Sequence, residues 1–130
     1  MPTVMVVDDS KTVRSYHGSI LKSMGMDLVE AENGMEALEK SLGAQIDLYL
    51  VDVNMPIMDG YSFIKDLRKQ DNHKIVPVIM VTTQEKEEDK INAYKAGANL
   101  FETKPIKPDQ IQAYLDIRTG PKVRPGKREG

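Results

Sequence analysis

The sequence alternates five times between a short apolar run and a longer stretch of mixed polarity. Apolar runs of this length suit strands buried on both faces, whereas the mixed stretches carry apolar residues at helical spacing. Because parallel strands need long crossovers, this order predicts a five-stranded parallel sheet with helices on both faces, a doubly wound (βα)5 fold. The expected strands are Thr3 to Val7, Asp27 to Ala31, Leu48 to Val51, Val76 to Val81 and Leu100 to Glu102.

Capping residues and glycines delimit the helices expected between these strands. Ser10 can cap the first helix, and Gly25 can end it. Of the two histidines, His17 is expected on the core-facing side of that helix, whereas His73 lies in a polar loop and is expected to face solvent. The other helices are expected from Met35 to Leu42, after Asp59-Gly60 around Phe63, before Gly97 around Ile91, and from Pro108 to about Ile117.

Length and composition exclude several classes of function. A chain of 130 residues has the size of one domain, and its formal net charge of -2 gives no electrostatic reason to expect nucleic-acid binding. Without cysteine, disulfides and thiolate metal sites are excluded. No stretch approaches the roughly 20 apolar residues that a membrane span needs. We therefore expect a cytoplasmic protein with one domain in residues 1–118 and a disordered basic tail in residues 119–130.

Polar side chains follow the carboxyl ends of the expected strands. Asp8 and Asp9 follow the first strand, Asp52 follows the third, and Thr82 and Lys104 follow the fourth and fifth. In this architecture these ends share one edge of the sheet, where ligands bind. Three carboxylates there repel one another, and a hard cation such as Mg²⁺, which prefers oxygen ligands, removes that repulsion. With a lysine ammonium and a threonine hydroxyl beside it, this edge suits a phosphoryl group in transfer.

Several motifs occur in order along the chain: Val6-Val7-Asp8-Asp9-Ser10, Leu50-Val51-Asp52-Val53-Asn54-Met55-Pro56, Met58-Asp59-Gly60, Val81-Thr82-Thr83, Ala96-Gly97-Ala98 and Lys104-Pro105. Together they resemble the receiver domain of two-component response regulators, from residue 3 to about residue 117. Within that family, the single-domain chemotaxis regulators of the CheY type are the most similar. The resemblance implies a flavodoxin-like, CheY-like fold, a signalling switch rather than an enzyme, and a cis peptide bond before Pro105.

The resemblance also implies a role for each residue at the acidic edge. Asp52 would accept the phosphoryl group. Asp9 would contact Mg²⁺ directly and Asp8 would act through water, while Asp52 and the backbone carbonyl of Asn54 would complete the metal site. Lys104 would pair with the phosphoryl group once it is attached.

A switch and two partners follow from the same resemblance. Thr82 would bond the phosphoryl group, and Phe101 would turn inward as Thr82 moves. The donor would be a sensor histidine kinase or a histidine phosphotransfer protein. A downstream protein target would bind the surface of the fourth helix, fifth strand and fifth helix, for which Tyr94, Phe101 and Tyr114 are candidates.

Other functions are compatible with parts of this pattern. The chain could be a phosphorelay intermediate, a receiver excised from a larger regulator, or a receiver that binds partners without phosphorylation. A phosphatase of the haloacid dehalogenase type also uses a strand-end aspartate with Mg²⁺. That family requires a second aspartate two residues later, where this chain has Asn54. Flavin binding is disfavoured because Asp8 and Asp9 would repel its phosphate.

Overall fold

Five parallel strands form a single sheet in the order β2-β1-β3-β4-β5. The computed structural model describes residues 2–83 and 86–119. The strands are β1 (Thr3–Val7), β2 (Asp27–Ala31), β3 (Leu48–Asp52), β4 (Val78–Thr82) and β5 (Leu100–Thr103). The expected doubly wound α/β fold is confirmed, and each strand lies within two residues of its predicted bounds.

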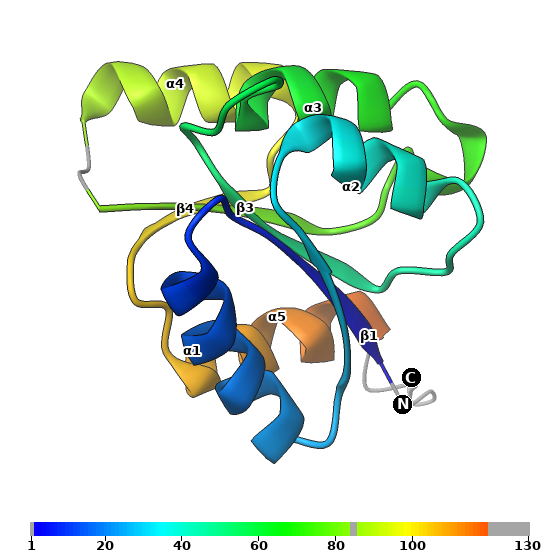
Figure 1. Ribbon diagram of the computed structural model, residues 1–130, viewed down its shortest axis with the longest axis vertical. Helices are drawn as coiled ribbons and strands as arrows, with labels where there is room; N and C mark the ends of the chain where they lie inside the picture. Colours follow the sequence, from blue (N-terminus) through cyan, green and yellow to red (C-terminus); the bar gives the residue numbers. More distant parts are fainter. Residues whose placement is uncertain (1, 84–85, 120–130) are drawn as a thin grey trace.

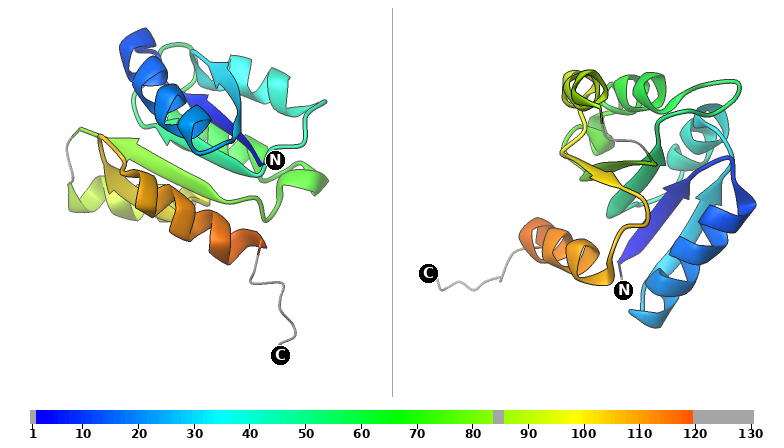
Figure 2. Two further views of the ribbon diagram at one scale, coloured as in Figure 1. Left: turned by 90° about the horizontal axis from the view of Figure 1, so that it is seen from below. Right: turned by 90° about the vertical axis from the view of Figure 1, so that its left-hand side faces the viewer.

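The helices form two layers, one on each face of the sheet (Figures 1 and 2). One layer consists of α1 (Lys11–Ser23) and α5 (Pro108–Thr119), and the other of α2 (Gly34–Ser41), α3 (Gly60–Leu67) and α4 (Glu87–Ala96). The chain moves from β1 outward to β2 and then returns past β1 to β3. The strand order therefore reverses between β1 and β3, and ligands in such sheets bind at the carboxyl ends around this point.

Each strand contributes alternate residues to two separate hydrophobic clusters. Met5 and Tyr49 pack with Phe63 in the α2-α3-α4 layer, whereas Val6 packs with Leu21 in the α1-α5 layer. This division follows from the two-residue period of a strand that is covered on both faces. Every helix in the described residues is too short or too polar to span a membrane.

Local sequence signals set most helix ends as expected. The Ser10 side chain accepts a hydrogen bond from the Val13 N–H and caps α1, and Gly97 ends α4 with φ +116°. The fourth strand begins at Val78 rather than at the predicted Val76, because Pro77 between them has no N–H for the ladder. Helix α5 continues to Thr119, and residues 120–130 of the predicted tail lie outside the described residues.

The prediction that His73 faces solvent is wrong. His73 ends a short 3-10 helix, Asp71–His73, and is 2% exposed. Its Nε2 lies 3.0 Å from the carbonyl oxygen of Ser41, and its Nδ1 lies 3.5 Å from the hydroxyl of Tyr49. The polar neighbours in the sequence concealed this burial, because the two partners lie 24 and 32 residues away along the chain. His17, in contrast, is buried as predicted.

Candidate functional site

Three carboxylates meet at the carboxyl ends of the two central strands. Asp52 is the last residue of β3, and Asp8 and Asp9 follow β1 directly. Val7 pairs with Val51 in the parallel register, so the next residues, Asp8 and Asp52, leave the sheet at the same level. One ligand oxygen from each of the three carboxylates lies within 4.8 Å of the others. This separation allows one hard cation to bind all three.

Lys104 closes this acidic pocket from the end of β5. Its Nζ lies 2.7 Å from Oδ2 of Asp8 and 3.0 Å from Oδ1 of Asp52. The Lys104 backbone N–H donates to the carbonyl oxygen of Thr82 at 2.7 Å, and the Lys104-Pro105 peptide bond is cis, as expected. The lysine is therefore held by its backbone as well as by the two carboxylates.

Burial and neighbouring charges shift the pKa values of both Asp52 and Lys104. Burial raises the pKa of Asp52, the charge of Asp8 raises it further, and the hydrogen bond from Lys104 opposes both effects. Burial lowers the pKa of Lys104, but its hydrogen bonds to Asp8 and Asp52 outweigh this and leave the pKa raised. The hydrogen bond and charge of Lys104 therefore do not cancel the combined effect of burial and of the neighbouring carboxylates on the pKa of Asp52. A bound cation would favour the ionised form of Asp52.

The other residues predicted at the site occupy three different settings. Thr82 is the last residue of β4 and is 7% exposed, so its side chain lies at the same sheet edge. Asn54 is exposed in the loop that follows Asp52. Phe101 is 3% exposed and packs in the hydrophobic cluster on the α2-α3-α4 side. The structure thus brings Asp8, Asp9, Asp52 and Lys104 into one pocket.

Comparison with known proteins gives this pocket a family. The response regulator receiver domain family matches residues 4–116, which is nearly all of the described chain. The chain belongs to the response regulator receiver family. Chemotaxis protein CheY1 of Helicobacter pylori is 37% identical over 119 residues, which cover 90% of this chain and 96% of that protein.

Solved structures of receiver proteins share the fold closely. Vibrio cholerae chemotaxis protein CheY4 is 35% identical with a TM-score of 0.83, covering 90% of this chain and 98% of that chain. The receiver domain of sensor histidine kinase PA1611 from Pseudomonas aeruginosa is 28% identical with a TM-score of 0.82, covering 89% of this chain and 95% of that chain. In that structure a magnesium ion is coordinated in the active site cleft.

Membership of the receiver family carries general properties. Receiver domains are signalling switches rather than classical enzymes, and they interact with histidine kinases and downstream targets. They bind Mg²⁺ in an acidic pocket, and the donor set of this chain fits that ion. The donors at the pocket are carboxylate oxygens, and no histidine or cysteine belongs to the cluster found in the described residues.

Two residues support the pocket in ways that the sequence analysis did not predict. Arg14 lies on the buried side of α1 with His17, Gly18 and Leu21, and it is only 8% exposed. Its spacing of three, four and seven residues from those positions could have placed it there. Gly60, the first residue of α3, lies directly against the backbone of Asp52.

Proposed function

We propose that this protein is a phosphorylation-dependent signalling switch in which Asp52 accepts a phosphoryl group in a Mg²⁺-dependent reaction. The observation that carries this proposal is the contact of Lys104 Nζ with both Asp8 and Asp52, inside a pocket of three clustered carboxylates. Such a pocket holds a nucleophile, a fixed cation and oxygen ligands for a metal within reach of one phosphoryl group.

In the proposed reaction, an oxygen of the Asp52 carboxylate attacks the phosphorus of a phosphohistidine. The P–N bond breaks, and its electron pair stays with the imidazole of the donor. Mg²⁺ held by Asp8, Asp9, Asp52 and the carbonyl of Asn54 would neutralise charge and leave coordination positions for a phosphoryl oxygen. Lys104 then pairs with the new phosphoryl oxygens, and the Thr82 hydroxyl donates a hydrogen bond to one of them.

The proposed output surface consists of α4, β5 and α5. Ile91 and Tyr94 on α4 are 46% and 44% exposed, although both are large apolar or aromatic residues. Ala93 and Ala96 form the buried side of this helix instead. Helix α4 therefore leaves apolar surface available to a downstream protein. Movement of Thr82 toward the phosphoryl group, with repacking of Phe101, would connect this surface to Asp52.

The proposed donor is a sensor histidine kinase or a histidine phosphotransfer protein, and the proposed pathway is chemotaxis in the cytoplasm. The names of two similar proteins, CheY1 and CheY4, support the pathway. The similar receiver from PA1611 belongs to a sensor histidine kinase, which supports this class of donor.

Intact-mass measurement after incubation with acetyl phosphate and Mg²⁺ tests the proposal. We expect wild type to gain one phosphoryl mass and Asp52→Asn to gain none. Asp59→Asn is a matched control, because the same chemical change is made in the following loop and asparagine caps α3 as well as aspartate does. A beryllofluoride titration tests the same site if the acyl phosphate is hydrolysed before its mass can be measured. Failure of both measurements in wild type, or phosphorylation of Asp52→Asn, would refute the proposal.

A further inference from the structure

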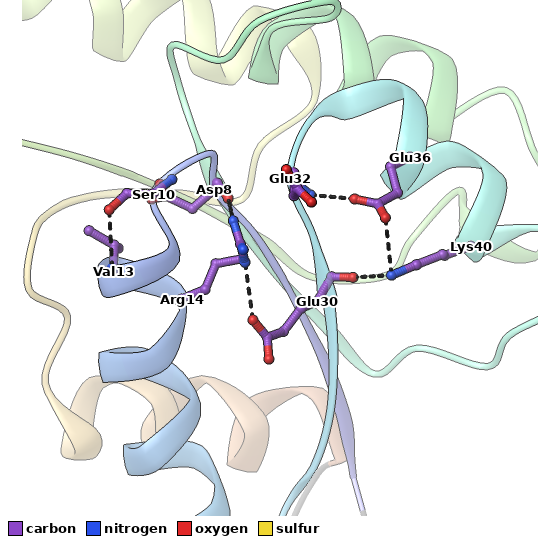
Figure 3. Close-up of polar contacts among 8 residues, drawn as sticks. All are labelled: Asp8, Ser10, Val13, Arg14, Glu30, Glu32, Glu36 and Lys40. Atoms are coloured by element: carbon purple, nitrogen blue, oxygen red, sulfur yellow. Dashed lines mark hydrogen bonds and ion pairs between the residues drawn. The ribbon is translucent and has the colours of Figure 1, made fainter.

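Arg14 connects α1 to the loop that carries Asp8 and Asp9. Its guanidinium is largely buried, with 10% of the side chain exposed. Nη1 donates to the backbone carbonyl oxygen of Asp8 at 2.6 Å, and Nε donates to Oε1 of Glu30 at 3.1 Å. Figure 3 shows Arg14 between these two acceptors, one after β1 and the other on β2. The proposed phosphoryl transfer gives this buried charge no role.

The carbonyl that Arg14 binds lies just beyond the β1-β2 ladder. The last register pair of the two strands is Val7 with Ala31, and the Asp8 N–H still donates to the Ala31 carbonyl oxygen at 3.1 Å. The Asp8 carbonyl follows this last ladder bond and is buried, so it needs a donor from outside the sheet. The guanidinium supplies that donor.

This bond fixes the peptide that joins the two pocket aspartates. The carbonyl of Asp8 and the N–H of Asp9 belong to one planar unit, so holding the carbonyl sets the orientation of both residues. On the other side of Asp9, the Ser10 N–H donates to Oδ1 of Asp8 at 2.9 Å, and the Ser10 side chain caps α1. Arg14 and Ser10 thus hold this short loop from both sides.

We propose that Arg14 is a positioning residue for the Mg²⁺ site of the proposed function, on which this inference rests. By holding the Asp8 carbonyl, Arg14 keeps the carboxylates of Asp8 and Asp9 at a spacing that suits a divalent cation. It does not touch the ion or the reacting atoms. Outer partners that orient metal ligands commonly change metal affinity when they are removed.

A short chain of polar contacts holds Glu30 in turn. Lys40 of α2 donates from Nζ to the Glu30 carbonyl oxygen at 2.5 Å and pairs with Glu36 at 3.4 Å. Glu36 also accepts a hydrogen bond from the Glu32 N–H at 2.6 Å (Figure 3). The end of β2, which supplies the second acceptor for Arg14, is therefore fixed to α2.

Positioning and simple electrostatics make opposite predictions for Arg14. A positive charge beside the acidic pocket repels a cation, so its removal would tighten Mg²⁺ binding if charge alone mattered. If Arg14 acts by holding the Asp8 carbonyl, its removal weakens Mg²⁺ binding. The sign of the change in Mg²⁺ affinity therefore separates the two explanations.

Arg68, whose side chain is partly buried, provides a control for the loss of a guanidinium that donates to backbone carbonyls. It also donates to backbone carbonyls, those of His73, Val76 and Gly97. These carbonyls precede β4 and β5, so they lie at the amino ends of the strands, whereas the acidic pocket lies at the carboxyl ends. Arg68→Met should therefore lower the free energy of unfolding without changing Mg²⁺ affinity.

Calorimetric titration with Mg²⁺ tests the inference on wild type, Arg14→Met and Arg68→Met, with urea unfolding measured in parallel without Mg²⁺. We expect the dissociation constant to rise about tenfold in Arg14→Met and to stay at the wild-type value in Arg68→Met. Unchanged or tighter Mg²⁺ binding by Arg14→Met would overturn the inference, as would an equal loss in Arg68→Met. Absence of Mg²⁺ binding by wild type would refute the proposed function as well.

Arg14→Lys and Glu30→Gln keep the test decisive if Arg14→Met does not fold. Lysine retains the charge but lacks the planar fork that reaches two acceptors, so an intermediate loss of Mg²⁺ affinity is expected. Glu30→Gln keeps an oxygen that accepts from Nε, so a smaller loss is expected. Wild-type Mg²⁺ affinity in Arg14→Lys would contradict the need for guanidinium geometry.

Discussion

Replacement of Gly60 by alanine places a methyl group against the backbone of the proposed acceptor residue. An ideal Cβ at this position would lie 2.2 Å from the Asp52 carbonyl oxygen and 2.6 Å from Cε of Met80. The flexible end of Met80 can move, but the Asp52 carbonyl can move only with its strand. Gly60 is also fixed by its own N–H, which donates to the Val53 carbonyl oxygen at 2.9 Å.

The expected loss of stability follows from this contact. Overpacking a well-packed site costs about 1–3 kcal/mol, and a clash with backbone belongs at the upper end of that range. The better helix propensity of alanine offsets at most about 1 kcal/mol of it. We therefore expect the free energy of unfolding of Gly60→Ala to fall by about 2 kcal/mol, out of a total of roughly 5–15 kcal/mol for a domain.

Urea denaturation followed by circular dichroism measures this loss. Gly43→Ala is the matched control, because a Cβ at Gly43 meets no atom within 4 Å. With a slope of about 1–3 kcal/mol per M, the unfolding midpoint of Gly60→Ala should fall by about 0.7–2 M urea. The folded fraction of Gly60→Ala should also bind beryllofluoride more weakly than wild type, because Asp52 is displaced. Wild-type stability in Gly60→Ala would refute the steric argument.

Three further predictions concern His17, Ile57 and Asp59. Burial, with a smaller effect from Lys104, holds the pKa of His17 below its ordinary value against the charge of Asp8. The unfolded chain therefore takes up the proton first, and the stabilising contribution of neutral His17 is present above about pH 6.5 and lost as the pH falls toward its folded pKa. In His17→Gln, the free energy of unfolding measured with urea should change less with pH over this range than in wild type. The same pH dependence in both proteins would contradict a lowered pKa of His17 in the folded state. Ile57 has φ +70° and is 78% exposed. Ile57→Gly should raise the thermal midpoint, since relief of about 1–2 kcal/mol of strain exceeds the entropic cost of glycine, whereas a lower midpoint would exclude strain at this residue. The Asp59 side chain caps α3 by accepting from the Ser62 N–H at 2.8 Å. Asp59→Ala should cost about 1 kcal/mol in urea unfolding and Asp59→Asn almost nothing, and an equal loss in both would show that the cap is not the cause.

The sequence predicts the architecture and the main site because both depend on short-range patterns. An apolar run that ends in Asp52 specifies a buried strand and also the level at which the carboxylate leaves the sheet. Once the strands are parallel, Asp8 and Asp52 must emerge at the same edge, since Val7 and Val51 are paired. To predict that these carboxylates meet, one needs only the alternation of strands and helices and the position of each aspartate at the end of its strand.

Contacts between distant segments could not be predicted in the same way. His73 has polar neighbours in the sequence, yet Tyr49 and the Ser41 carbonyl bury it. The spacing of Arg14 indicates the buried side of α1, but its partner Glu30 lies 16 residues away on another strand and could not be identified from that spacing. A local pattern can indicate which side of a helix is buried, but the acceptors that a buried charged side chain needs are brought together only by folding.

The charges of the pocket explain why a divalent cation is the expected ligand at this edge. Asp8, Asp9 and Asp52 carry three negative charges, and Lys104 offsets one of them through contacts at 2.7 and 3.0 Å. Two negative charges remain at a partly buried place, where burial, together with the charge of Asp8, raises the pKa of Asp52. A monovalent cation would leave one charge uncompensated, whereas Mg²⁺ would neutralise the pocket before the doubly charged phosphoryl group of the proposed reaction arrives. Lys104, which is paired with Asp52 before the proposed reaction, would move to the phosphoryl oxygens as that carboxylate became an acyl phosphate.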